Sequence, residues 1–197
     1  MRQARFATCA AILLLLTAQA WASSVLGLSI EDQARLSRLV VTGEVVAQRG
    51  VVDPESGVET AVNLRVTEVF KGDVQPGDTI VFHTRSGEVD GLMSDAVGEA
   101  RLHVGQEVLV FIEDIDGRLY NLGLSMGVWN LQLDRGGRAY FTRALEEGLD
   151  VVGDVEVETG PVTITDMARR VDAAVRQPAF DHPLLQLRLA PNTQGRR

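Results

Sequence analysis

The chain has 197 residues, and its 27 acidic side chains outnumber its 19 lysines and arginines, which gives a formal net charge of -8. This balance argues against nucleic acid as a partner, because affinity for a phosphate backbone comes mainly from lysine and arginine. Anionic membrane surfaces are disfavoured for the same reason.

The first 22 residues have the three parts of a secretory signal peptide. Arg2 and Arg5 form a basic region, residues 10–16 form an apolar run, and Ala20-Trp21-Ala22 resembles a cleavage site. The apolar run is shorter than the roughly 20 residues that a bilayer core requires. We therefore expect cleavage after Ala22, export to the periplasm or the medium, and no membrane insertion afterwards. The only cysteine, Cys9, leaves with the signal peptide, so no disulfide is expected.

The first elements expected in the mature chain are a helix and two strands. Ser29 followed by Asp32 is a capping-box pattern and predicts a short helix over residues 30–38. Residues 39–48 are rich in valine and predict a strand, with a bend or bulge at Gly43. Residues 50–57 are expected to form a loop. Residues 58–67 alternate apolar and polar side chains, as in a half-buried strand.

The middle of the chain combines glycine turns with short strands. We expect a turn in residues 71–78 and a strand over 79–85. Residues 86–106 are glycine-rich and weakly patterned, so we expect a long loop that holds a helical turn or forms a mobile flap. Residues 108–112 are continuously apolar and predict a buried strand. Asp116-Gly117 is a hairpin signal, which returns the chain along residues 119–124.

The remaining segments continue this pattern and end in a helix. Residues 128–133 predict a strand with Trp129, Leu131 and Leu133 pointing inward, followed by strands at 139–142 and 151–158. Thr163 with Asp166 is a second capping-box pattern, and the apolar stripe that follows predicts an amphipathic helix covering the barrel. Residues 178–197 show no sustained pattern and are expected to be disordered.

Short strands joined by glycine turns, with a helix at each end, predict a mainly β fold. We expect one domain over residues 23–177, built as a small antiparallel OB-like barrel with a short N-terminal helix and a C-terminal amphipathic helix.

Four segments resemble a known type of exported domain. They are LVVTGEVV, TAVNLRVTEVFKG, VGQEVLVFIE and LGLSMGVWNL, and the resemblance extends over roughly residues 40–133. The chain resembles an uncharacterised bacterial exported domain whose barrel is OB-like or netrin-like and whose genes often neighbour those of matrixin-like metalloproteases. The resemblance implies an accessory role beside another exported protein, and its motifs carry no catalytic residue.

The segment GLSMG, residues 123–127, matches the G-x-S-x-G pattern of serine hydrolases and makes Ser125 a candidate nucleophile. That pattern requires a strand, a sharp turn and a helix, whereas the residues after Gly127 predict a strand. The only histidine downstream is His182. We interpret GLSMG as a backbone bend and keep catalysis by Ser125 as the alternative.

Metal sites are not expected either. The pairs His83 with Glu88 and His103 with Glu99 lack the third protein ligand that catalytic zinc normally has. Asp114-x-Asp116-Gly117 resembles the start of a calcium loop without its later acidic ligands, so we interpret it as a hairpin turn. The other acidic residues are interpreted as a solvated surface: Asp53, Glu55, Glu59, Glu146, Glu147, Asp150 and Asp154.

The sequence thus predicts an exported, non-catalytic binding or accessory module without cofactor, acting with a secreted or periplasmic protein such as a metalloprotease. The alternative is a small secreted serine hydrolase that uses Ser125.

Overall fold

The computed structural model describes residues 23–177. The predicted signal peptide and the predicted disordered tail both lie outside the described residues. Within residues 23–177, neither helix is long and apolar enough to span a bilayer.

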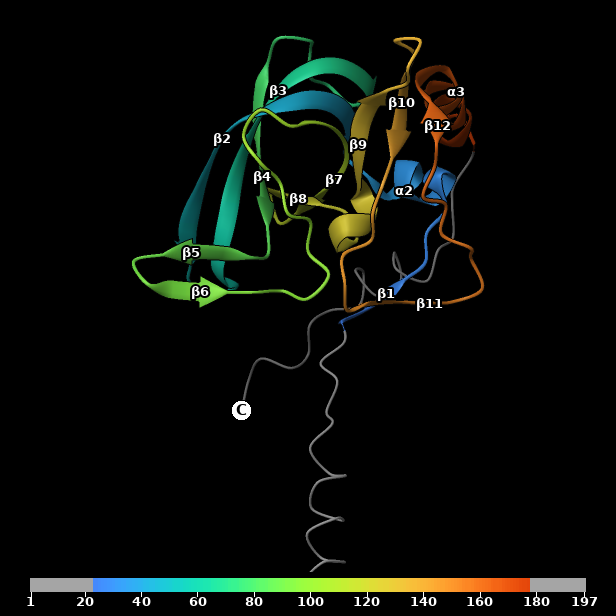
Figure 1. Ribbon diagram of the computed structural model, residues 1–197. Helices are drawn as coiled ribbons and strands as arrows, with labels where there is room; N and C mark the ends of the chain where they lie inside the picture. The colour runs from blue at the N-terminus through green and yellow to red at the C-terminus, as the bar shows by residue number, and fades with distance from the viewer. Residues whose placement is uncertain (1–22, 178–197) are drawn as a thin grey trace, which may run out of the picture.

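The fold is mainly β, as predicted, and its largest sheet has eight strands in the order β12, β10, β9, β7, β2, β3, β4, β8 (Figure 1). Strand β8 also pairs with β7, so it contacts both β4 and β7. The eight strands are β2 (Leu39–Asp53), β3 (Gly57–Lys71), β4 (Thr79–Thr84), β7 (Glu107–Ile115), β8 (Arg118–Asn121), β9 (Val128–Leu133), β10 (Ala139–Thr142) and β12 (Val162–Thr163).

Two pairs of short strands lie outside this sheet. Strand β1 (Ser23–Leu26) runs parallel to β11 (Leu149–Val152), and β5 (Gly87–Val89) forms a hairpin with β6 (Leu92–Ser94). Figure 1 shows the β5–β6 hairpin at the lower left, across the ends of β2 and β3. The expected long loop over residues 86–106 is corrected in its first part, where β5 and β6 pair as a hairpin, and no helical turn forms within residues 86–106.

Both predicted helices are confirmed, together with their caps. Helix α2 (Ile30–Leu36) begins after Ser29, whose hydroxyl accepts the backbone N–H of Asp32 at 3.1 Å. Helix α3 (Ile164–Val175) begins after Thr163, which accepts the N–H of Asp166 in the same way. The helices are joined by an ion pair between Arg170 and Glu31 at 2.6 Å.

The strand predictions hold in outline, with corrections at the ends. The expected loop over residues 50–57 is wrong, because Val51 and Val52 continue β2 and pair with Glu59 and Val58. The hairpin at Asp116-Gly117 is confirmed, since β7 and β8 pair up to this turn. The predicted strand over 151–158 is confirmed only in part, at β11.

The buried apolar side chains form two clusters, one on each side of the β2–β7 region. One lies among β2, β3, β4 and β7 and includes Phe82 and Leu64. The other lies under α2 and α3 and includes Trp129, Phe141 and Met167. The inward placement of Trp129 is confirmed, whereas that of Leu133 is wrong, because Leu133 is exposed near the end of β9.

Lys71 joins the end of β3 to the end of α2. Its Nζ donates to the carbonyl oxygens of Ala34, Arg35 and Ser37 at 2.7, 3.2 and 2.6 Å. These carbonyls belong to the last helical turn and its cap, which have no partners within the helix. The ammonium therefore caps α2 and gives the lysine of the TAVNLRVTEVFKG segment a structural role.

We expect Lys71→Met to lower the free energy of unfolding by about 1–2 kcal/mol, because it leaves the three carbonyl oxygens without this charged donor. Urea denaturation followed by circular dichroism measures the loss. Arg38→Met is the control, since Arg38 pairs with Asp73 at 3.2 Å on an exposed surface and should contribute at most about 0.5 kcal/mol. Equal effects of the two changes would contradict the capping role.

Candidate functional site

Ser125 lies in a tight turn between two strands. It belongs to a 3-10 helix, η1 (Leu124–Gly127), which leads directly into β9. Its side chain is buried, and its hydroxyl accepts the backbone N–H of Glu146 at 3.2 Å. A nucleophilic serine needs an exposed hydroxyl at a strand-to-helix turn and a histidine within hydrogen-bond reach. Here the hydroxyl holds a neighbouring loop, and His182 lies outside the described residues.

The turn is also fixed by a buried arginine. The Arg143 guanidinium lies 4.4 Å from the ring centroid of Trp129, donates from Nε to the carbonyl of Glu158 at 2.7 Å, and donates to the carbonyl of Met126. Carbonyl oxygens from two separate segments are thus satisfied by one side chain. The surroundings of Ser125 are those of a structural turn.

The two histidines of the described chain lie in different settings. His83 on β4 is half-buried beside Tyr120, and burial, reinforced by the charge of Arg118, lowers its pKa. His103 is exposed, whereas its sequence partner Glu99 is buried and accepts the N–H groups of Arg85 and Ala100. Across residues 23–177, the structure places no group of three or more His, Cys, Asp or Glu side chains around a potential metal position.

A charged cluster lies where β3, β4 and β8 meet. Glu59 is 1% exposed, accepts the hydroxyl proton of Tyr120 at 3.0 Å and pairs with Arg118 at 2.9 Å. Arg118 also pairs with Asp53, whose pKa the backbone N–H groups of Ser56 and Glu55 lower to about 2. The interpretation of Glu59 as part of a solvated surface is therefore wrong, because Tyr120 and Arg118 cover it.

The contacts of this cluster hold β8 against β3 and β4. Strands β4 and β8 are joined by a single residue pair, His83 with Tyr120, and the Glu59 contacts reinforce that pair. Burial, followed by the hydrogen bond to Glu59, raises the pKa of Tyr120, so its hydroxyl stays protonated and donates. The groups satisfy one another and leave little for a ligand.

Within residues 23–177, two surfaces present grouped side chains for contact with a partner. The first, which we call the hairpin patch, consists of Val52, Leu92 and Met93, with exposed fractions of 60%, 59% and 71%. Leu92 pairs with Val89 across the β5–β6 hairpin. A Cβ on Gly50 would lie 3.3 Å from the Cβ of Val89, and Val52 is two residues farther along the same face of β2. Val52 and Leu92 therefore lie where the hairpin crosses β2, and Met93, the next residue of β6, projects from the opposite face of the same hairpin.

The second surface, the Tyr140 platform, lies on β9, β10 and β12. Tyr140 pairs with Gln132 of β9 and with Thr163 of β12, and Thr142 pairs with Asn130. Residues that pair directly, or that are two apart on a strand, share one face of a sheet. The platform therefore consists of Asn130, Gln132, Tyr140, Thr142 and Thr163.

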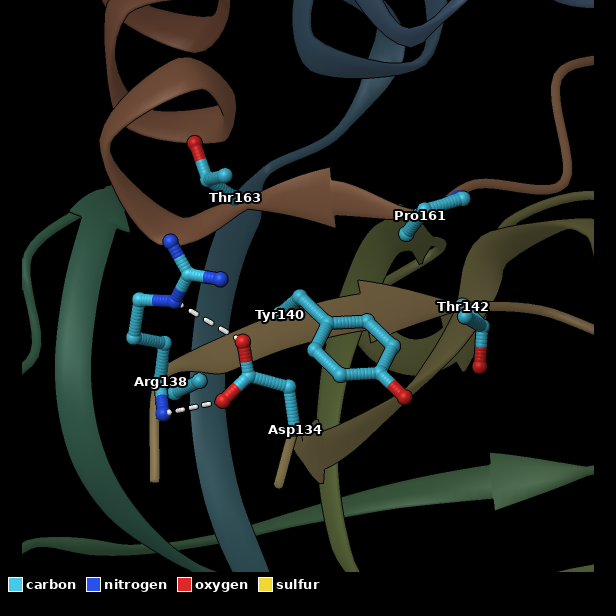
Figure 2. Close-up of a pocket in the computed structure, with 7 residues that line it drawn as sticks. Asp134, Arg138, Tyr140, Thr142, Pro161 and Thr163 are labelled. Carbon is cyan, nitrogen blue, oxygen red and sulfur yellow. Dashed lines mark hydrogen bonds and ion pairs between the residues drawn. The ribbon is translucent and has the colours of Figure 1, made fainter. Parts of the chain in front are cut away.

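A hollow of about 580 Å³ lies over the platform. Figure 2 shows the Tyr140 ring in its centre, Thr142 on one side, Asp134 and Arg138 on the other, and Pro161 and Thr163 above. The Asp134 carboxylate accepts the backbone N–H groups of Gly136 and Arg138 and the Nε of Arg138, which together keep its pKa low. The other nitrogen atoms of the Arg138 guanidinium extend into an exposed position.

Sequence reasoning had named neither surface. The platform residues come together only when β9, β10 and β12 pair. The patch depends on the β5–β6 hairpin, in a segment that the sequence predicts to be a loop. The adjacent apolar residues Leu92 and Met93 in a glycine-rich loop were the available signal for the patch. The chain matches no protein-family model and no curated protein sequence.

Proposed function

We propose that this protein is an exported, non-catalytic binding module that docks on another secreted or periplasmic protein through the hairpin patch. The observation that carries the proposal is the exposure of three large apolar side chains, Val52, Leu92 and Met93, on and beside one short hairpin. Grouped large apolar side chains on a surface mark protein interaction sites more often than scattered ones do. Methionine adds a flexible, polarizable contact that adapts to a partner.

The architecture that presents the patch is, in this proposal, an OB-like barrel. Its support is the run of pairings from β7 through β2, β3, β4 and β8 back to β7. An OB-fold is a five-stranded, partly open barrel, and the loops at its rim commonly hold ligands. The β5–β6 hairpin follows β4, within the segment where the sequence predicts a helical turn or a mobile flap.

The hairpin is held firmly against the sheet. A Cβ on Gly50 would overlap the carbonyl of Glu88, so the two backbones touch. The side chain of Thr60 on β3 donates to the carbonyl of Ser86 at 2.7 Å. Because this segment is already ordered, the hairpin loses little conformational entropy when a partner binds it.

Charge indicates the character of the partner. Glu88 and Asp90 flank the patch on the hairpin and are exposed. A matching surface would carry an apolar pocket rimmed by lysine or arginine, since opposite charges at the rim speed and orient association. A matrixin-like metalloprotease is the partner class implied by the sequence resemblance, and it is the first to test.

We expect the exported protein to lose its partner when the patch becomes acidic. A photoreactive residue at position 93 should cross-link one defined exported protein, and Leu92→Asp with Met93→Asp should abolish binding of that purified partner. Leu133→Asp is the matched control, because Leu133 is equally exposed at the end of β9. Binding that survives the patch variant but not the control would contradict the proposal.

Two further measurements test the predicted export of the protein and the proposed absence of catalysis by Ser125. The intact mass of the exported protein should correspond to a chain that begins at Ser23, and a mass that retains residues 1–22 would contradict export by cleavage.

A fluorophosphonate should leave the protein unlabelled. Labelling at Ser125, or esterase turnover that disappears in Ser125→Ala, would establish the hydrolase alternative instead.

A further inference from the structure

We infer that the Tyr140 platform is a binding site for a neutral polysaccharide, with one sugar ring stacked on Tyr140. The site lies on β9, β10 and β12 and is separate from the hairpin patch, so it goes beyond the proposed docking function. The opposite face of these strands contributes Phe141 and Leu131 to the core. The outward face is consequently fixed by the pairing of the strands.

The platform matches the two kinds of surface on a sugar. A pyranose ring has an apolar C–H face and a rim of hydroxyl groups that both donate and accept hydrogen bonds. The Tyr140 ring, flanked by Ala139 and Pro161, offers a flat apolar surface at the floor of the hollow. Its hydroxyl donates to Gln132 Oε1 at 3.1 Å, which fixes the ring against rotation out of the plane of the site.

Polar groups of the required kinds surround the ring. Thr142 and Thr163 line the hollow on either side of the ring, and Figure 2 shows the Thr163 hydroxyl directed toward the start of α3. Thr163 accepts the N–H of Asp166 as the cap of α3, so Thr142 supplies the hydroxyl beside the ring. Arg138 is held by Asp134 through Nε at 2.8 Å, and its two terminal nitrogens remain donors toward the hollow. Few polar groups around an apolar floor are typical of ligand pockets of this size.

The charges at the platform favour a neutral ligand. Asp134 offsets Arg138, and Asp166 offsets Arg169 at the start of α3, so no cation is left in excess. An anionic polymer would also be repelled by the net charge of the chain.

The hydrogen-bonding pattern argues against an extended peptide. Peptides that add to a sheet bind mainly through main-chain hydrogen bonds at a free strand edge. At Tyr140, strand β10 is already paired on both sides, with β9 and with β12. Recognition at the platform must therefore come from side chains, which suits a hydroxyl-rich ligand.

Affinity electrophoresis of the purified protein tests this inference. Native gels containing a neutral glucan, a galactomannan or a xylan should retard the wild-type protein in at least one case, while a gel containing alginate should not. Tyr140→Ala should weaken the retarding interaction by about tenfold or more, and Tyr140→Phe should keep most of it, because the ring remains. Leu133→Ala, at an exposed site on the other face of β9, should bind like the wild type.

Arg138→Ala is a second test of the site, and it leaves the Tyr140 ring in place. The Arg138 side chain is 88% exposed, so its loss leaves the core intact. It should reduce retardation by about threefold, and thermal melts should show each variant folded. Retardation by no neutral polysaccharide, retardation by alginate alone, or undiminished binding in both Tyr140→Ala and Arg138→Ala would overturn the inference. Binding of a peptide that depends on Tyr140 would overturn it as well.

Discussion

Gly127→Ala is expected to lower the free energy of unfolding by about 3 kcal/mol or more. A Cβ at this position would overlap the carbonyl oxygen of Leu122 and lie 3.0 Å from its carbonyl carbon. The Leu122 backbone is held beside β7, because the Leu122 N–H donates to the carbonyl of Phe111 at 2.8 Å. The strain therefore falls on backbone that the sheet holds in place. Urea denaturation should show an earlier midpoint with an unchanged slope.

Two matched variants separate this strain from other effects. Gly136→Ala lies in the turn between β9 and β10, where a Cβ would meet only a side-chain oxygen of Asp134 at 3.2 Å, so the change should stay within about 1 kcal/mol. Ser125→Ala should cost about 1 kcal/mol, because it leaves the N–H of Glu146 without its acceptor. A Gly127→Ala protein as stable as Gly136→Ala would show that the turn does not require glycine.

Glu59→Ala is expected to destabilise the protein by about 3 kcal/mol. The variant leaves the Tyr120 hydroxyl and one Arg118 nitrogen without their buried acceptor. Arg118 keeps its ion pair with Asp53, which limits the loss. Because one residue pair joins β4 to β8, amide exchange at β8 should accelerate more than exchange in β2 or β3.

The two controls for Glu59 probe one hydrogen bond within the cluster and one ion pair outside it. Tyr120→Phe removes one hydroxyl and should cost about 1 kcal/mol. Glu44→Ala removes a carboxylate that pairs with Arg65 on the surface of β2 and β3, and it should stay within about 0.5 kcal/mol. If Glu59→Ala and Glu44→Ala had equal effects, the cluster would not lock β8.

The sequence by itself determined the features whose signals are local. Ser29 and Thr163 cap their helices through hydrogen bonds that reach only three residues ahead. Asp116-Gly117 makes a hairpin between adjacent strands. The alternation in residues 58–67 placed Val62 and Leu64 in the core, because side chains alternate between the two faces of a strand.

Only the tertiary structure decided what covers the outward faces. The same alternation placed Glu59 on the outside of β3, where solvation was expected, yet Tyr120 lies 61 positions away in the sequence and covers it. Likewise, Tyr140 became the centre of a platform because β9 and β12 pair beside it. Periodicity along one strand specifies which face a side chain occupies, whereas its neighbours on that face depend on pairing between distant segments.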